Sequence, residues 1–148
     1  MDFDIKSYIG AGPLRYGMSI QEVRNVLGGP FRTFKRAPSV VAPSDQFIDI
    51  GVIANYRPAG TVSSIEFAKP SNPTFRGIAL FSESVEQLTS LLRDADPAIE
   101  IDNGGATSKA LGLGFYAIMD EPAENEPGEL LSIIAFEKGY HDASKGTT

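Results

Sequence analysis

The residues best suited to chemistry by their type and spacing lie in one acidic stretch, residues 120–129. Five of its ten residues are carboxylates, two are prolines and none is basic. Such charges repel one another and attract a basic surface, which speeds association. Phe115 and Tyr116 stand shortly before the stretch, and aromatic residues anchor many protein interfaces. The pattern predicts a docking site for a basic protein, with a solvated loop as the alternative.

The predicted partner-binding residues combine the carboxylates of this stretch with aromatic residues from neighbouring strand-like segments. They are Tyr56, Phe115, Tyr116, Asp120, Glu121, Glu124, Glu126 and Glu129. In this hypothesis the carboxylates steer a basic partner toward the chain, and the rings supply the contacts that hold it.

Residue types for catalysis or metal binding are scarce elsewhere. The chain has one histidine, His141, and no cysteine, which excludes a disulfide framework, thiolate metal sites and a thiol nucleophile. The carboxylates within residues 94–102 alternate, but they lack the ligand order of a calcium loop. We interpret them as a charged helix end and turn, and we expect no catalytic residue, no metal and no cofactor.

A short glycine motif, Gly10-Ala11-Gly12, precedes the first helical pattern and invites comparison with a phosphate-binding loop. Pro13 interrupts the motif, and the third glycine of a dinucleotide-binding fingerprint is missing. The motif therefore predicts a plain turn.

A basic and aromatic patch occupies residues 31–36. It contains three basic and two aromatic residues, a combination that can hold phosphates and stack on bases. On a chain with a net charge of −6, three positive charges give only weak binding to nucleic acid. We interpret the patch as the solvated edge of a sheet, where charges also discourage aggregation.

Length and composition indicate one ordinary globular domain over residues 1–148. The chain is 42% hydrophobic and 22% charged, and its acidity disfavours nucleic acid and anionic membranes as partners. No apolar run approaches the roughly 20 residues of a membrane-spanning helix, so we expect a cytoplasmic protein. Residues 77–148 carry thirteen acidic and four basic side chains, which makes this half the expected docking surface for a basic partner.

Two segments have the pattern of capped amphipathic helices. Ser19 and Glu22 form a capping box ahead of an apolar stripe that ends at a Gly-Gly-Pro sequence. In the second half Ser82 or Ser84 is the expected cap, and apolar residues follow at helical spacing over 85–92.

The other regular segments alternate or are rich in β-branched and aromatic residues, which predicts strands. They cover residues 3–9, 46–50, 52–57, 61–68, 75–81, 111–119 and 130–137. The order strand, helix, strands occurs twice, which predicts internal repeats over about 3–69 and 75–138 with a linker at 70–74. The expected fold is α+β: two tandem helix-plus-antiparallel-strand units form one sheet, with both helices packed on one face.

The sequence from Tyr16 to Pro30 contains Gly-Met-Ser before a short apolar stripe and Leu-Gly-Gly-Pro after it. It resembles the capped helix of outer-membrane assembly lipoproteins of the SmpA/OmlA group, and it is similar to the helix that opens each repeat of the β-lactamase inhibitor protein fold. The resemblance implies tandem units of a helix and an antiparallel meander, with a binding role. Those lipoproteins need an N-terminal cysteine and the inhibitor carries disulfides, whereas this chain has no cysteine.

The chain also looks like small cytoplasmic bacterial immunity proteins, which neutralise toxins. The hypothesis that follows is a non-enzymatic protein-binding module, an immunity or inhibitor protein that engages a basic toxin or enzyme through an open sheet face and the acidic stretch. Three alternatives stay open: a small-molecule pocket between sheet and helices, a carboxylate-based enzyme, and a homodimer that pairs sheet edges.

Overall fold

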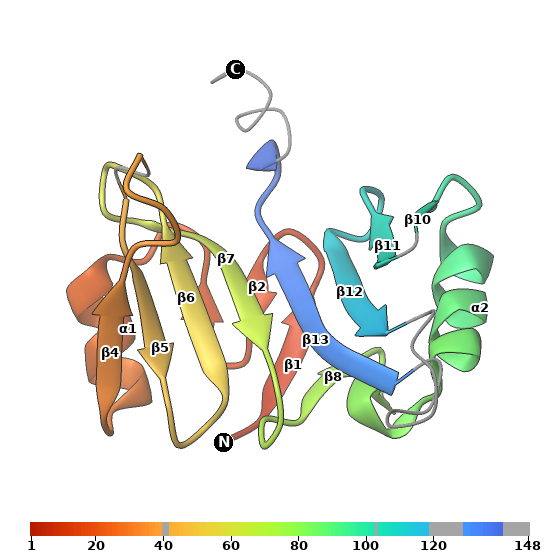
Figure 1. Cartoon of the computed structure of the whole chain (residues 1–148), viewed down its shortest axis with the longest axis horizontal. Helices are drawn as coiled ribbons and strands as arrows, with labels where there is room; N and C mark the ends of the chain where they lie inside the picture. Colours follow the sequence, from red (N-terminus) through yellow and green to blue (C-terminus); the bar gives the residue numbers. More distant parts are fainter. Residues whose placement is uncertain (40–41, 103, 119–128, 141–148) are drawn as a thin grey trace.

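Two antiparallel meanders, each preceded by a short helix, make up most of the chain (Figure 1). This computed structural model describes residues 1–39, 42–102, 104–118 and 129–140. The first unit consists of α1 (Ile20–Leu27), β4 (Phe31–Phe34), β5 (Ser44–Phe47), β6 (Val52–Tyr56) and β7 (Val62–Phe67). The second consists of α2 (Val85–Ala95), β10 (Glu100–Asp102), β11 (Gly105–Ser108), β12 (Leu113–Ile118) and β13 (Glu129–Phe136).

The two meanders join into one eight-stranded sheet through their last strands. β7 and β13 pair antiparallel, with Ile65 opposite Ala135 and Glu66 opposite Ile134. The strand order is therefore β10-β11-β12-β13-β7-β6-β5-β4, and β4 and β10 are the edges of this large sheet.

A second, five-stranded sheet forms from segments outside the meanders. Its strands are β1 (Phe3–Lys6), β2 (Gly10–Ala11), β3 (Leu14–Arg15), β8 (Pro73–Phe75) and β9 (Ile78–Ala79), and a 3-10 turn, η1 (Leu80–Ser82), follows β9. The order is β3-β2-β1-β8-β9, and β1 pairs with β8 in parallel, with Phe3 opposite Pro73.

The core lies between the two sheets. Figure 1 shows the small sheet behind the middle of the large one, with α1 and α2 on its two sides. The Phe3 ring of β1 and the Phe67 ring of β7 lie 5.4 Å apart, centroid to centroid, in a tilted arrangement. Val23 of α1 and Leu88 of α2 belong to the same buried cluster, so burial of apolar side chains ties both helices to the two sheets.

The predicted α+β fold, with helices packed on one face of a single sheet, is wrong. The described residues are mostly β, with sheets of eight and five strands and two short α-helices among them. Segments with turn-like sequences form short strands: Gly10–Ala11 is β2, and Pro73–Phe75 is β8, which begins inside the expected linker. β2 is too short to show a periodic pattern, and β8 pairs with β1, which is distant in the sequence, so no local periodicity could predict the small sheet.

Both predicted helix starts are confirmed. The Ser19 hydroxyl accepts a hydrogen bond from the Glu22 amide at 3.1 Å, and the Glu22 carboxylate accepts one from the Ser19 amide at 3.0 Å. In the second helix Ser84 is the cap, and Gln87 completes the same box. These paired bonds satisfy backbone donors that each helix start would otherwise leave without a partner.

The repeats expected over about 3–69 and 75–138 stay a prediction, although each stretch does supply one helix and four strands of the large sheet. In the part of the chain that the structure describes, no helix is long and apolar enough to cross a membrane.

Candidate functional site

The large sheet has one face in the core and one face toward solvent. Along β6, Val52, Ala54 and Tyr56 are buried, whereas Ile53 and Asn55 between them are only half-buried. Successive side chains of a strand point to opposite faces, so the pairing registers show which residues of the neighbouring strands share the side of Ile53 and Asn55. We call the solvent side the open face; its side chains are Arg32, Phe34, Gln46, Ile53, Asn55, Glu66, Tyr116 and Ile134.

A polar network fixes the middle of the open face. Asn55 donates hydrogen bonds to the Glu66 carboxylate at 2.7 Å and to the Ser64 hydroxyl at 3.0 Å. Its side-chain oxygen accepts a hydrogen bond from the Ser44 hydroxyl at 2.6 Å. Arg36 forms an ion pair with Glu66 and also reaches the Asn55 oxygen, at 3.3 Å. Three neighbouring strands, β5, β6 and β7, together with Arg36 just after β4, thus present a surface whose polar groups are already oriented.

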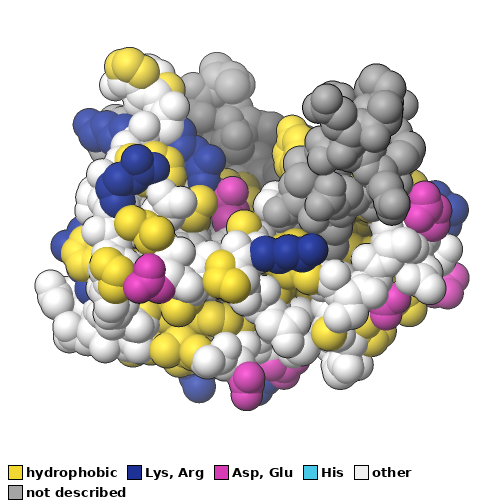
Figure 2. Space-filling view, turned by 60° about the horizontal axis from the view of Figure 1, so that its bottom comes forward, with side chains coloured by type: hydrophobic (Ala, Val, Ile, Leu, Met, Phe, Trp, Pro, Cys, Tyr) yellow, Lys and Arg dark blue, Asp and Glu magenta, His cyan; other side chains and the backbone are white. Residues whose placement is uncertain are grey.

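Basic and aromatic side chains gather at the β4 end of this face. Two guanidinium groups lie near the Phe34 ring, with the carbon of Arg32 at 5.7 Å and that of Arg36 at 5.6 Å from its centroid. Arg32 also donates a hydrogen bond to Gln46 at 2.8 Å. In Figure 2 Lys and Arg side chains gather at the upper left, on the side of the molecule where β4 lies. The interpretation of residues 31–36 as a sheet edge is confirmed, since β4 ends the large sheet.

Tyr116 is the most exposed aromatic residue on the other half of the face. Its side chain is 64% exposed. The ring lies against Gly104, where a β-carbon would come within 3.0 Å of the ring's Cε1 atom. An aromatic ring held in place while its face remains accessible is the type of group that supplies much of the binding energy at an interface.

The structure separates the predicted partner-binding residues. Tyr56 and Phe115 are core residues, 5% and 4% exposed, so neither offers a surface to a partner. Phe115 faces inward because it precedes Tyr116 on the same strand. Asp120, Glu121, Glu124 and Glu126 lie outside the described residues, and Glu129 begins β13, its side chain not being described.

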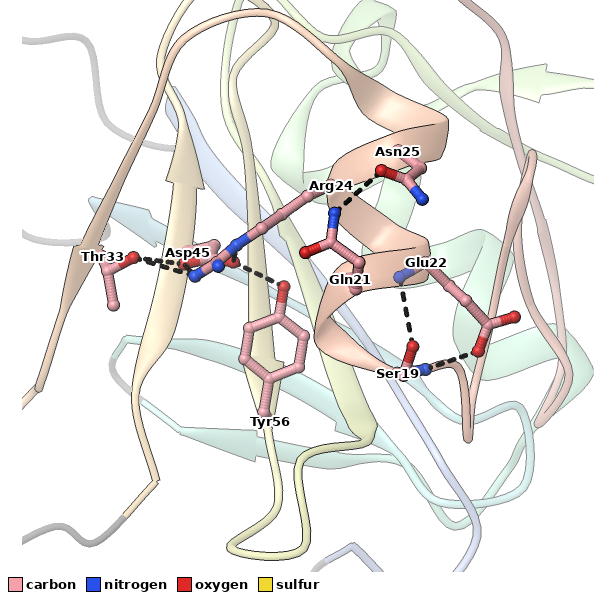
Figure 3. Close-up of polar contacts among 8 residues, drawn as sticks. All are labelled: Ser19, Gln21, Glu22, Arg24, Asn25, Thr33, Asp45 and Tyr56. Carbon is pink, nitrogen blue, oxygen red and sulfur yellow. Dashed lines mark hydrogen bonds and ion pairs between the residues drawn. The ribbon is translucent and has the colours of Figure 1, made fainter.

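A buried carboxylate, which the sequence interpretation missed, supports the β4 end of the face (Figure 3). Asp45 of β5 is fully buried, and each of its oxygens accepts two hydrogen bonds. Arg24 donates to both oxygens, at 2.9 and 3.1 Å. Thr33 donates to Oδ1 at 2.7 Å, and Tyr56 donates to Oδ2 at 2.8 Å. We call these four residues the Asp45 cluster.

The Asp45 cluster is an anchor that connects α1 with three strands. Burial by itself raises the pKa of Asp45, but the hydrogen bonds from Arg24, Thr33 and Tyr56 outweigh it, so the pKa lies below its ordinary value. Burial, together with the bond to the charged carboxylate, raises the pKa of Tyr56. Both residues therefore keep their normal charge states at neutral pH. Each oxygen of the Asp45 carboxylate already accepts two hydrogen bonds, so neither is free to take a proton from a substrate. Its role is to hold β4 and β5 against α1.

The Tyr16 hydroxyl allows a test of whether hydrogen bonds are what make buried polar groups stabilising in this fold. It is buried without a hydrogen-bond partner in the described part of the chain, and burial raises its pKa. We expect Tyr16→Phe to leave stability unchanged or to raise it by up to about 1 kcal/mol, because no bond is lost and a desolvated hydroxyl is removed. Urea unfolding measures the change.

Tyr56→Phe is the matched control and should lose about 1–2 kcal/mol of unfolding free energy, since Tyr56 donates a hydrogen bond to Asp45. Equal losses for the two variants would contradict the assignment.

Of the carboxylates expected at a helix end and turn, Asp94 and Asp96 are at the end of α2, whereas Glu100 and Asp102 lie in the strand β10. Asp96 ends α2, where it accepts hydrogen bonds from the Ser108 hydroxyl at 2.7 Å and the Ala98 amide at 3.0 Å. Among the residues that the structure describes, no three histidine or carboxylate side chains come together as a metal site.

Comparisons with known proteins leave the resemblance to the inhibitor and lipoprotein folds a prediction. No family model, curated protein or solved structure matches the chain.

Proposed function

We propose that this chain is a non-enzymatic protein-binding module and that its partner docks on the open face of the large sheet. The observation that carries the proposal is Tyr116, a 64% exposed aromatic residue on a sheet face whose polar groups are already oriented. Binding to such a surface requires little ordering of side chains, so less interaction free energy is lost when the complex forms.

The proposed role is that of an immunity or inhibitor protein. Its partner is a toxin or enzyme whose basic surface meets the acidic half of the chain, with residues 120–129 steering the approach. At the β4 end of the face, Arg32 and Arg36 suit acidic groups on the same partner. The proposal includes a cytoplasmic location, which agrees with a sequence that has no cysteine.

The test is capture of the partner from the cell's own lysate by the tagged chain at low and high salt, followed by an affinity measurement with the purified partner. Tyr116→Ala should weaken the complex at least about tenfold, as loss of an interface anchor does. Ile9→Ala is the matched control, because Ile9 is also exposed but lies in the turn between β1 and β2 of the small sheet.

Two outcomes decide the proposal. A stoichiometric partner that binds the Ile9 variant normally and the Tyr116 variant weakly supports it. A partner that binds the Tyr116→Ala, Arg32→Ala and Arg36→Ala variants as tightly as the native chain shows that the open face is not the docking surface.

A further inference from the structure

A cavity separate from the open face lies between the β8–β9 hairpin and α2. Its volume is about 320 Å³, at the lower end of the range for small-molecule pockets. Apolar side chains form most of its lining: Phe75, Ile78, Leu80, Leu88, Leu91 and Leu92. Leu91 is 37% exposed, so the cavity is open to solvent on the helix side. Such a lining favours an apolar group of limited size.

The two charged residues of the lining stand on different elements. Arg76 belongs to the hairpin and Asp94 belongs to α2. Neither forms an ion pair with another residue in the described ranges, where the four ion pairs join other residues. The Arg76 guanidinium carbon lies 5.0 Å from the centroid of the Phe75 ring, so the charge is held beside the apolar lining. One cation and one anion therefore border the same apolar space.

The backbone of Arg76 supplies a second, independent observation. Arg76 and Gly77 form the two-residue turn between β8 and β9, with φ angles of 52° and 81°. Turns of this kind favour asparagine or glycine at the first position, because at positive φ the β-carbon of most residues comes too close to a backbone carbonyl oxygen. Strained residues of this sort concentrate at binding sites, where the side chain has a role that the turn itself does not need.

We propose that this cavity binds a free amino acid with a large apolar side chain. Its carboxylate pairs with Arg76, its ammonium group pairs with Asp94, and its side chain enters the space lined by the leucines of α2. At about 320 Å³, the cavity is large enough for one amino acid of this size. The proposal goes beyond docking of a protein on the open face and does not depend on it.

Titration calorimetry with the whole chain tests the ligand class through analogues that each lack one group. The probes are L-phenylalanine, 3-phenylpropionate without the ammonium group, phenethylamine without the carboxylate, and glycine without the side chain. L-Phenylalanine should bind with a dissociation constant below about 1 mM, and each analogue should bind at least about tenfold more weakly. No heat from L-phenylalanine or L-leucine up to about 10 mM overturns the proposal. Equal binding of 3-phenylpropionate also overturns it, because the site would then recognise any apolar carboxylate.

Variants of the two charged residues test the positions of the ligand groups. Arg76→Gly removes the guanidinium and places at positive φ the residue that this turn favours, so the melting temperature should stay the same or rise. Both Arg76→Gly and Asp94→Asn should weaken L-phenylalanine binding at least about tenfold. Arg93→Gln is the matched control, because Arg93 precedes Asp94 in α2 but does not line the cavity. Native affinity in both test variants would overturn the assignment.

Discussion

The variant Arg24→Met is expected to lose about 3–5 kcal/mol of unfolding free energy at pH 7, as happens when one partner of a buried ion pair is removed. Methionine retains much of the length of the side chain but supplies neither the charge nor the two hydrogen bonds to Asp45. The carboxylate is fully buried and cannot turn toward water. Arg24 itself is 29% exposed, so it has access to solvent that Asp45 lacks. Chemical unfolding with urea measures the loss.

The pH dependence of this variant identifies the buried carboxylate as the cause. In the native chain the pKa of Asp45 lies below its ordinary value, so its contribution to stability is present above about pH 4 and is lost as the pH falls through the lowered pKa. Without Arg24, burial raises the pKa of Asp45. As the pH falls, the carboxyl group of the variant is therefore protonated, which removes the buried unpaired charge and restores part of the lost stability. The stability difference between the two proteins should therefore shrink between pH 7 and pH 4.

The double variant Arg24→Met/Asp45→Asn is the control for that effect. Asparagine retains contacts with Thr33 and Tyr56 but carries no charge, so the double variant should be more stable at pH 7 than Arg24→Met alone. A loss in Arg24→Met that is the same at pH 7 and pH 4, and that the second substitution does not reduce, would contradict this account.

Gly105→Ala should destabilise the chain by about 3 kcal/mol or more, because two costs coincide there. The residue has a φ angle of 155°, which side chains disfavour, and a β-carbon would lie 1.9 Å from the carbonyl oxygen of Phe115 on the paired strand. A backbone oxygen cannot rotate away as a side chain can, so β11 and β12 would have to separate at this point. Thermal unfolding of the purified variant measures the effect.

Gly77→Ala is the matched control for the glycine prediction. Gly77 also has a positive φ angle, 81°, but a β-carbon there would meet no atom within 4 Å. It should cost only about 1–2 kcal/mol, the penalty of the left-handed conformation itself. Since Gly105 pairs with Tyr116, the Gly105 variant should also weaken partner binding, whereas the Gly77 variant should not. Similar losses in the two variants would show that the contact across β11 and β12 is not the cause.

Local signals in the sequence predicted the helices and the longer strands well. The Ser19–Glu22 capping box has a sequence signature because its partners are three residues apart, and the structure contains it. The alternating segment 61–68 became β7, Val62–Phe67, for the same reason: burial on one face of a strand repeats every two residues.

Features that depend on distant residues could not be predicted in this way. The small sheet is built on the parallel pairing of Phe3 with Pro73, and two-residue strands such as β2 show no alternation. The Asp45 cluster joins residues up to 32 positions apart, and a single aspartate in a strand-like segment is also typical of an exposed site. Tyr56 shared the spacing of the buried Val52 and Ala54, a signal that should have placed it in the core.

The position of β13 has a consequence for how the chain folds during its synthesis. β13 comes last in chain order among the described strands, yet it lies in the middle of the large sheet between β12 and β7. Until the ribosome has released residues 129–136, both of those strands expose unpaired backbone groups, and neither meander is closed on that side. We therefore expect completion of the sheet to be a late step that joins distant segments, one that slows folding and leaves open strand edges exposed to aggregation until it occurs.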